Sequence, residues 1–161
     1  MSGTIETTPA TTSATTGRQV LATWVRKVPG GPMESRDALD VVAGEGVVGD
    51  HTRGGKRHVT LIFADDWAAA LRDLGSDVPP SARRANVLVS GGSGGALIGR
   101  RVRLGGVLLE IGGETRPCGI MDEAAPGLME ALRPDARAGV WGRALEGGRI
   151  APGARLEVLD A

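Results

Sequence analysis

The sequence predicts a β-rich α+β fold. Glycine is abundant, with 26 residues among 161, whereas aromatic residues are scarce: three Trp, one Phe and no Tyr. Many glycines without a collagen period indicate tight turns between short strands. The core is therefore expected to come from Val, Leu, Ile and Ala, in about eight short apolar runs and two helical patterns.

Short apolar runs bounded by Gly or Pro predict the strands. One pair forms a hairpin, because Gly105-Gly106 is a recognised two-residue turn signal. Full or partial closure of these strands into a barrel would remove the exposed sheet edges. The predicted strands span residues 20–28, 39–42, 59–63, 85–89, 101–104, 107–111, 139–145 and 155–159.

Two helices are predicted. Apolar residues recur at spacings of four and three within residues 64–74, and Gly75 follows as a stop signal. A second, shorter helix is predicted over residues 126–133, because Pro126 suits a helix start and Pro134 ends it.

Composition limits the class of protein. A length of 161 residues suits one domain over residues 18–161. Residues 1–17 are rich in Thr and Ser, and we expect them to form a disordered tail. Lys plus Arg equals Asp plus Glu at 19 each, so the charge predicts no general attraction to nucleic acid or to an anionic membrane. No apolar run approaches the ~20 residues of a membrane span and no signal peptide is evident, so we expect a cytoplasmic protein.

Cys118 is the only cysteine, which excludes an intramolecular disulfide and a CxxC zinc knuckle. Pro117 precedes it and Gly119 follows it, so its backbone is expected to form a fixed turn. Arg116 lies two residues back, and a nearby guanidinium favours thiolate over thiol. The alternative interpretation is an inert small residue in a turn.

Two further segments suggest an anion site. The loop over residues 51–58 holds His51, Arg53, Lys56, Arg57 and His58, together with two glycines that let the backbone approach a ligand. Four of them, His51, Arg53, Lys56 and His58, can supply anion contacts, and the histidines can also shuttle a proton. The alternatives are an ordinary loop pair for His51 with its neighbour and a half-buried strand position for His58.

Arg84 and Asn86 lead into the strand predicted over residues 85–89, where they can hold a phosphate by charge and by directed hydrogen bonds. A solvated surface charge and a turn residue are their respective alternatives. Arg143 alternates with apolar neighbours, which also suits an outward strand position. The glycine-rich run over residues 90–95 does not match a phosphate-loop motif, and we expect a flexible connection there.

The order of the motifs resembles that of the MOSC domain family, named for the C-terminal domain of molybdenum-cofactor sulfurases. Free-standing bacterial members are small proteins like this one, and the resemblance covers nearly all of residues 18–160. The segments that carry it are Gly49-Asp50-His51, Arg57 to Ile62, Arg84 to Gly91, Ile98 to Val102, Arg116-Pro117-Cys118, Pro126 to Leu132, Gly139 to Arg143 and Glu146 to Gly153.

The resemblance implies a MOSC-type β-barrel of short mixed strands with a few short helices. It also implies a pocket for a sulfur-type or molybdopterin-type ligand, with Cys118 as a persulfide carrier or a molybdenum ligand, since thiolate is a soft ligand. We expect Arg116 and His58 to assist Cys118 in catalysis. The expected cofactor-binding residues are His51, Arg53, Lys56, Arg84, Asn86 and Arg143.

Three functions agree with a ligand pocket and a reactive Cys118. The first is a sulfurtransferase-like or molybdenum-dependent enzyme that uses Cys118, and the second is a non-catalytic carrier of sulfur or cofactor. The third is molybdenum-free sulfur chemistry on a small metabolite, with formation or cleavage of a C–S bond. Molybdenum cofactor is the implied cofactor, a desulfurase or reductase is the implied partner, and pyridoxal phosphate is not expected within this chain.

Overall fold

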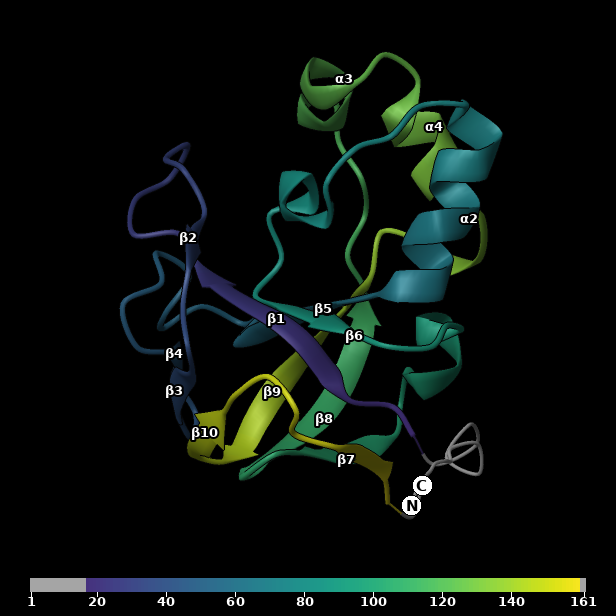
Figure 1. Cartoon of the computed structure of the whole chain (residues 1–161). Coiled ribbons are helices and arrows are strands. Elements are labelled where there is room, and N and C mark those ends of the chain that lie inside the picture. The colour runs from purple at the N-terminus through teal and green to yellow at the C-terminus, as the bar shows by residue number, and fades with distance from the viewer. Residues whose placement is uncertain (1–16, 160–161) are drawn as a thin grey trace, which may run out of the picture.

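The computed structural model describes residues 17–159 and has a β-rich α+β fold, as predicted (Figure 1). Apart from Gly17, the tail expected over residues 1–17 lies outside the described residues. Within the described residues, no helix combines the length and apolar character that crossing a membrane requires.

The larger sheet has eight strands in the order β11-β7-β8-β9-β5-β6-β1-β2. Neighbouring strands are antiparallel except β5 and β6, which run parallel, so the strands are mixed as expected. Their bounds are β1 Val20–Val25, β2 Glu34–Ser35, β5 Val59–Phe63, β6 Val87–Val89, β7 Arg101–Leu104, β8 Val107–Glu114, β9 Val140–Glu146 and β11 Leu156–Val158.

Closure of this sheet into a barrel is not confirmed, because the strand order has two ends, β11 and β2. The chain just before β1 does approach the chain just before β11. An isolated antiparallel bridge joins Gln19 to Arg155, and the backbone N–H of Val20 donates to the carbonyl of Ala154 at 2.8 Å. A separate three-stranded sheet contains β10 (Gly148–Ile150), β3 (Leu39–Val42) and β4 (Gly46–Val47) in that order.

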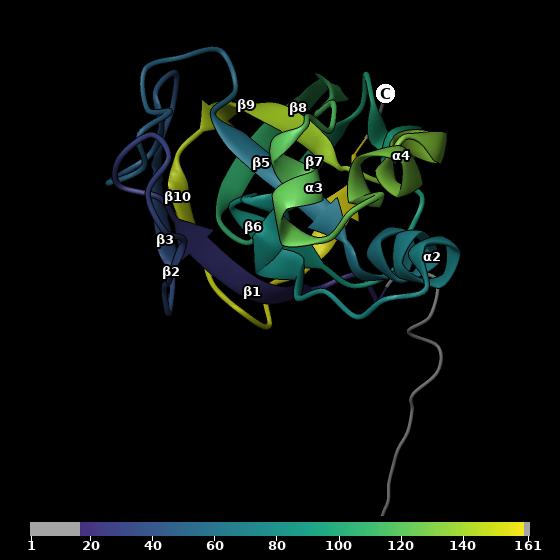
Figure 2. The ribbon, with the colours of Figure 1, turned by 90° about the horizontal axis from the view of Figure 1, so that it is seen from above.

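The helices gather on one side of the large sheet (Figure 1). α2 spans Ala64–Leu74 as predicted and ends at Gly75, which adopts a left-handed conformation. α4 spans only Leu128–Leu132, whereas the sequence predicted residues 126–133. α3 (Ile120–Ala124) was not predicted; it follows the cysteine turn and overlies the strands when the molecule is seen from above (Figure 2).

Two apolar clusters stabilise these layers. The first lies among the strands and includes Leu61, Leu109 and Ile111, which are almost fully buried. The second joins α2, α3 and α4, whose Trp67, Met121, Leu128 and Leu132 side chains are buried together. The helical layer therefore has a small apolar core of its own, which packs α3 against α2 and α4.

Two predicted strand boundaries and the flexible connection expected over residues 90–95 differ from the structure. The first strand ends at Val25 instead of residue 28, because the backbone N–H of Arg26 donates to the Asp50 carboxylate instead of continuing the ladder. The strand predicted from residue 85 begins at Val87, after a left-handed residue at Arg84. The glycine-rich run is a defined turn that leads into η3 (Gly94–Leu97), where the Asp66 carboxylate accepts hydrogen bonds from successive backbone N–H groups.

Candidate functional site

A pocket of about 160 Å³ lies where β1 and β8 end and where β5 and β6 begin. Because β1 runs antiparallel to β6, the end of one strand lies beside the start of the other. The segments after β1 and before β6 therefore meet at the pocket, and the loop before β5 and the residue after β8 complete its lining. The pocket is lined by Arg26, Asp50, His51, Thr52, Arg57, Thr60, Arg83, Arg84, Ala85, Asn86 and Thr115.

The charge of this pocket is strongly unbalanced. Four of the lining residues are arginines, and Asp50 is the only carboxylate among them. Within residues 17–159, none of these four arginines forms a salt bridge, whereas seven arginines outside the pocket pair with Asp or Glu. A concave surface with several unpaired guanidinium groups is suited to bind an anion.

Asp50 does not neutralise these arginines through contact, because its oxygens are used elsewhere. Oδ1 accepts the backbone N–H of Arg26 at 2.9 Å and an amide N–H of Asn86 at 3.3 Å. Oδ2 accepts both the backbone N–H and the hydroxyl of Thr52. The buried Asp50 carboxylate thus ties the loop after β4 to the end of β1 and to the start of β6.

Asn86 lines the pocket, but its amide is fully used within the protein. Its oxygen accepts the backbone N–H and the hydroxyl of Thr60, both at 3.1 Å, and its nitrogen donates to Asp50 and to the carbonyl of Trp24. An Asn side chain has two donors and two acceptor positions, so none remains for a ligand. Asn86 positions Asp50 and the neighbouring strands in this structure, where the sequence had suggested direct contact with a phosphate.

Arg83 is the most deeply placed cation of the site. It ends η2 (Pro80–Arg83), and its guanidinium donates from Nε to the carbonyl of Ala138 at 2.8 Å and from Nη2 to that of Thr115 at 3.3 Å. Burial lowers the pKa of Arg83 to about 10; the negative charge that Cys118 can carry opposes this shift, and the charge of Arg57 adds to it. Arg83 remains charged at neutral pH.

Arg26 and Arg84 lie close enough to affect each other. Burial lowers the pKa of Arg26, the charge of Arg84 lowers it further, and Asp50 opposes both effects. Arg84 itself has a φ of 67°, a left-handed conformation that is costly for a residue with a Cβ atom. Strained backbone of this kind is typical of functional sites, where the rest of the fold holds it in place.

A second, open cavity of about 420 Å³ adjoins the pocket and shares His51, Thr52 and Arg57 with it. It is formed by the loop before β5 and also includes Arg53 and Lys56. Arg53 is exposed and forms a salt bridge with Glu45, with 2.8 Å between Nη2 and Oε1. Arg53 and Lys56 therefore line only the adjoining cavity, whereas His51 and Arg57 also line the pocket itself.

Cys118 is exposed and lies in the turn between β8 and α3, three residues after the pocket residue Thr115. Its carbonyl accepts the backbone N–H of Met121 at 2.9 Å, which starts α3. Arg116 is also exposed, and the arginine whose pKa responds to a charge on Cys118 is Arg83. Among the described residues, no three His, Cys, Asp or Glu side chains are grouped to hold a metal ion.

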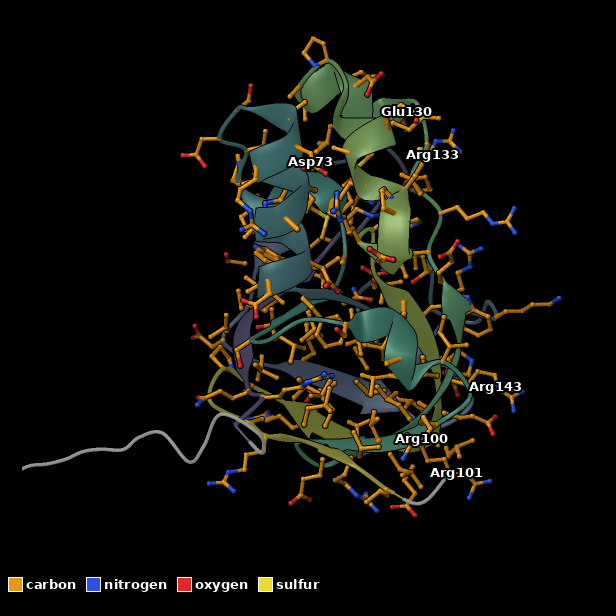
Figure 3. All side chains as sticks on the ribbon, turned by 90° about the vertical axis from the view of Figure 1, so that its right-hand side faces the viewer. Asp73, Arg100, Arg101, Glu130, Arg133 and Arg143 are labelled. Carbon is orange, nitrogen blue, oxygen red and sulfur yellow. The ribbon has the colours of Figure 1, made fainter. Side chains whose placement is uncertain are left out.

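His58 and Arg143 do not line the pocket. His58 is buried at the start of β5, and its Nδ1 accepts the backbone N–H of Ala144 at 2.9 Å. Arg143 is on β9, and its Nη2 lies 2.9 Å from Oε1 of Glu110. Figure 3 shows Arg143 on the sheet half of the molecule with Arg100 and Arg101, whereas Glu130 and Arg133 lie on the helical half.

The sequence did not single out several pocket residues, namely Arg26, Arg57, Arg83, Thr60 and Thr115 as ligand-facing positions. Two features of the sequence could have pointed to these arginines. Arg83 and Arg84 form a doublet directly before an apolar strand, and Arg26 is a charged residue at the end of another strand. Neither signal says which strand ends lie together, because that depends on the order of strands in the sheet.

The chain belongs to the MOSC domain family, since the sequence model of the MOSC domain matches residues 48–157. The fold also resembles solved structures. The YuaD protein from Bacillus subtilis has a TM-score of 0.72 at 19% identity, covering 88% of this chain and 96% of that one. YiiM from Geobacillus stearothermophilus has a TM-score of 0.70 at 17% identity, covering 89% and 75%. YiiM from Escherichia coli has a TM-score of 0.65 at 15% identity, covering 89% and 70%. A search of curated proteins found no match.

Proposed function

We propose that this protein handles sulfur, with the arginine pocket holding the anionic group of a ligand and Cys118 supplying the reactive sulfur atom. The observation that carries the proposal is the group of four arginines without carboxylate partners beside the turn that contains the only cysteine. Membership of the MOSC family, which is linked to molybdenum cofactor, adds support.

The residues present fit the anionic end of a molybdopterin-type cofactor. Arg26 has a buried Nε–H without a hydrogen-bond partner among the described residues, and such a group suits a phosphate oxygen. The pocket is smaller than the roughly 300–1,000 Å³ of sites that enclose a whole ligand. The remainder of a large ligand would therefore extend toward the open cavity formed by the loop over residues 51–57.

Bound molybdenum would supply redox and atom-transfer chemistry, and Cys118 is the residue of this chain that can ligate it, because thiolate is a soft ligand. Arg26, Arg57, Arg83 and Arg84 would hold the anionic group by charge-assisted hydrogen bonds. Asp50 and Asn86 would keep the strand ends in position around it.

Sulfur transfer to Cys118 needs only a persulfide donor, such as a desulfurase partner. The Cys118 thiolate attacks the outer sulfur of the donor persulfide, a new S–S bond forms on Cys118, and the donor leaves as a thiolate. No external oxidant or reductant enters this exchange. The exposure of Cys118 agrees with transfer between proteins. The same transfer step is expected for a sulfurtransferase and for a non-catalytic sulfur carrier.

The decisive experiment measures molybdenum and pterin in the purified protein, together with intact mass. A persulfide adds about 32 Da, the mass of one sulfur atom. Molybdenum with pterin supports a cofactor-binding enzyme, whereas a persulfide alone supports a carrier or sulfurtransferase. If neither is found after exposure to a persulfide donor and cofactor, the molybdenum-free alternative on a small metabolite takes precedence.

Cys118→Ser should abolish the added mass and any thiolate-dependent metal binding. Ile120→Ala is the matched control, because Ile120 is also exposed and lies two residues further on, at the start of α3. Retention of sulfur and metal by Cys118→Ser would overturn the proposed role of Cys118.

A further inference from the structure

Arg26 and His51 form a closely bonded pair at the wall of the pocket. Nη2 of Arg26 lies 2.8 Å from Nε2 of His51, and the backbone N–H of His51 donates to the carbonyl of Arg26, also at 2.8 Å. The backbone N–H of Arg26 in turn donates to Oδ1 of Asp50. Arg26 is therefore held at its backbone and at one end of its guanidinium.

The side-chain contact defines the state of the imidazole. A guanidinium has only donors, so Nε2 of His51 must be the acceptor, and the ring hydrogen of the neutral form must be on Nδ1. His58, the only other histidine, is in the opposite arrangement, because its Nδ1 accepts the backbone N–H of Ala144. The two histidines thus provide an internal comparison.

One donor of Arg26 is buried and has no partner after these contacts. Its Nε atom is buried and has no hydrogen-bond partner among residues 17–159. A buried N–H of a charged group without a partner is costly, and an anion oxygen would satisfy it. The same anion would also relieve the repulsion between Arg26 and Arg84, which Asp50 only partly offsets.

We propose that His51 is a positioning residue, which holds the guanidinium of Arg26 so that its buried Nε–H binds an oxygen of a tetrahedral dianion. Sulfate and phosphate monoesters belong to this class, and a pocket of about 160 Å³ accommodates such a group. The assignment rests on the proposed function, because it concerns the same pocket. It names the class of anion that Arg26 would bind and gives His51 an indirect role in that binding.

The test measures the Kd of inorganic sulfate and of inorganic phosphate by calorimetry at constant ionic strength. His51→Ala should weaken binding of both anions by about tenfold, because Arg26 loses its anchor. His51→Gln should restore most of the affinity, since its Oε1 can accept from Nη2 near the position of Nε2. Arg26→Gln should weaken binding at least as much as His51→Ala. Arg72→Ala, an exposed arginine of α2 outside the pocket, is the control and should change nothing.

Nitrogen NMR of the imidazoles supplies a second readout that loss of stability alone would not move. His51 should show the Nδ1–H form and should respond to sulfate, whereas His58 should show the Nε2–H form and should not respond. Arg26→Gln should change the His51 signals and leave those of His58 in place.

The outcomes separate this assignment from the proposed function. Equal anion binding by His51→Ala and the unchanged protein would overturn the positioning role and leave the anion pocket intact. Failure of His51→Gln to restore affinity, or an Nε2–H form of His51, would also overturn it. If the unchanged protein binds neither anion, the inference and the anion pocket both fail, while the sulfur chemistry of Cys118 is tested separately by mass and metal content.

Discussion

Arg83 donates a hydrogen bond from Nε to the carbonyl of Ala138 at 2.8 Å, although 55 positions separate the two residues. This contact joins the end of η2 to the segment just before β9. Arg83 also donates to Thr115, so one guanidinium connects three segments at the pocket. Arg83 therefore links segments of the fold by hydrogen bonds and also supplies a buried positive charge to the pocket. Measurements of stability and of anion affinity can separate these two roles.

Arg83→Met should weaken sulfate binding by about tenfold or more, because it removes the most buried cation of the pocket. The free energy of unfolding should change by less than about 2 kcal/mol, since loss of two hydrogen bonds is opposed by relief of a buried charge. Calorimetry and urea unfolding measure the two effects, with Arg72→Met as the control. Unchanged affinity would remove Arg83 from the ligand site.

Arg84→Gly should stabilise the fold by about 1 kcal/mol while it weakens anion binding. The φ of 67° at Arg84 is favourable for glycine, and the substitution also removes repulsion with Arg26. The same change at Arg72, inside α2, should instead destabilise by about 1 kcal/mol, because glycine is a poor helix former. A loss of stability in Arg84→Gly comparable to that of Arg72→Gly would show that Arg84 is not strained.

His58 should make stability depend on pH in the acidic range. Burial, and to a lesser extent the charge of Arg143, lowers the pKa of His58. The folded protein therefore resists protonation at this site more than the unfolded chain does. Stability should be highest above about pH 6.5 and should fall as the pH decreases below that value.

Urea unfolding between about pH 5 and pH 8 tests this expectation. His58→Asn should flatten the pH dependence, since Oδ1 can still accept from Ala144 and no ionisable group remains. His58→Ala should cost about 1–3 kcal/mol, because the buried N–H of Ala144 loses its acceptor. Arg72→Met, which removes an exposed arginine and no histidine, serves as the control and should leave the dependence of stability on pH unchanged. If the free energy of unfolding of His58→Asn depends on pH as strongly as that of the unchanged protein, the pH dependence comes from another group.

Gly139→Ala should lower the free energy of unfolding by more than about 2 kcal/mol. Gly139 has a φ of 108°, and a Cβ atom there would lie 2.2 Å from the carbonyl oxygen of Leu61 on β5. Gly119→Ala is the matched control, because Gly119 has a φ of −58° and no heavy atom within 4 Å of an added Cβ. Thermal and urea unfolding compare the pair, and equal stability would contradict the close approach at Gly139.

Local patterns were enough to predict much of the fold. The helix over residues 64–74, the hairpin at Gly105-Gly106 and most of the short strands were predicted, because each depends on residues that are near one another in sequence. The strand beginning at residue 20 was predicted too long, since its end is defined by a hydrogen bond from Arg26 to Asp50 across the fold.

The sequence by itself determined the family, the turn that exposes Cys118 and the presence of many cations near predicted strand ends. Only the tertiary structure decided which of them meet. The order of the strands brings Arg26, Arg57, Arg83 and Arg84 to one pocket. Arg143 instead forms a salt bridge with Glu110 on the sheet. The side-chain amide of Asn86 forms all of its hydrogen bonds with neighbouring protein groups. The reason is physical: turn and helix signals depend on neighbouring residues, whereas the geometry of a site depends on hydrogen bonds and burial between segments far apart in the chain.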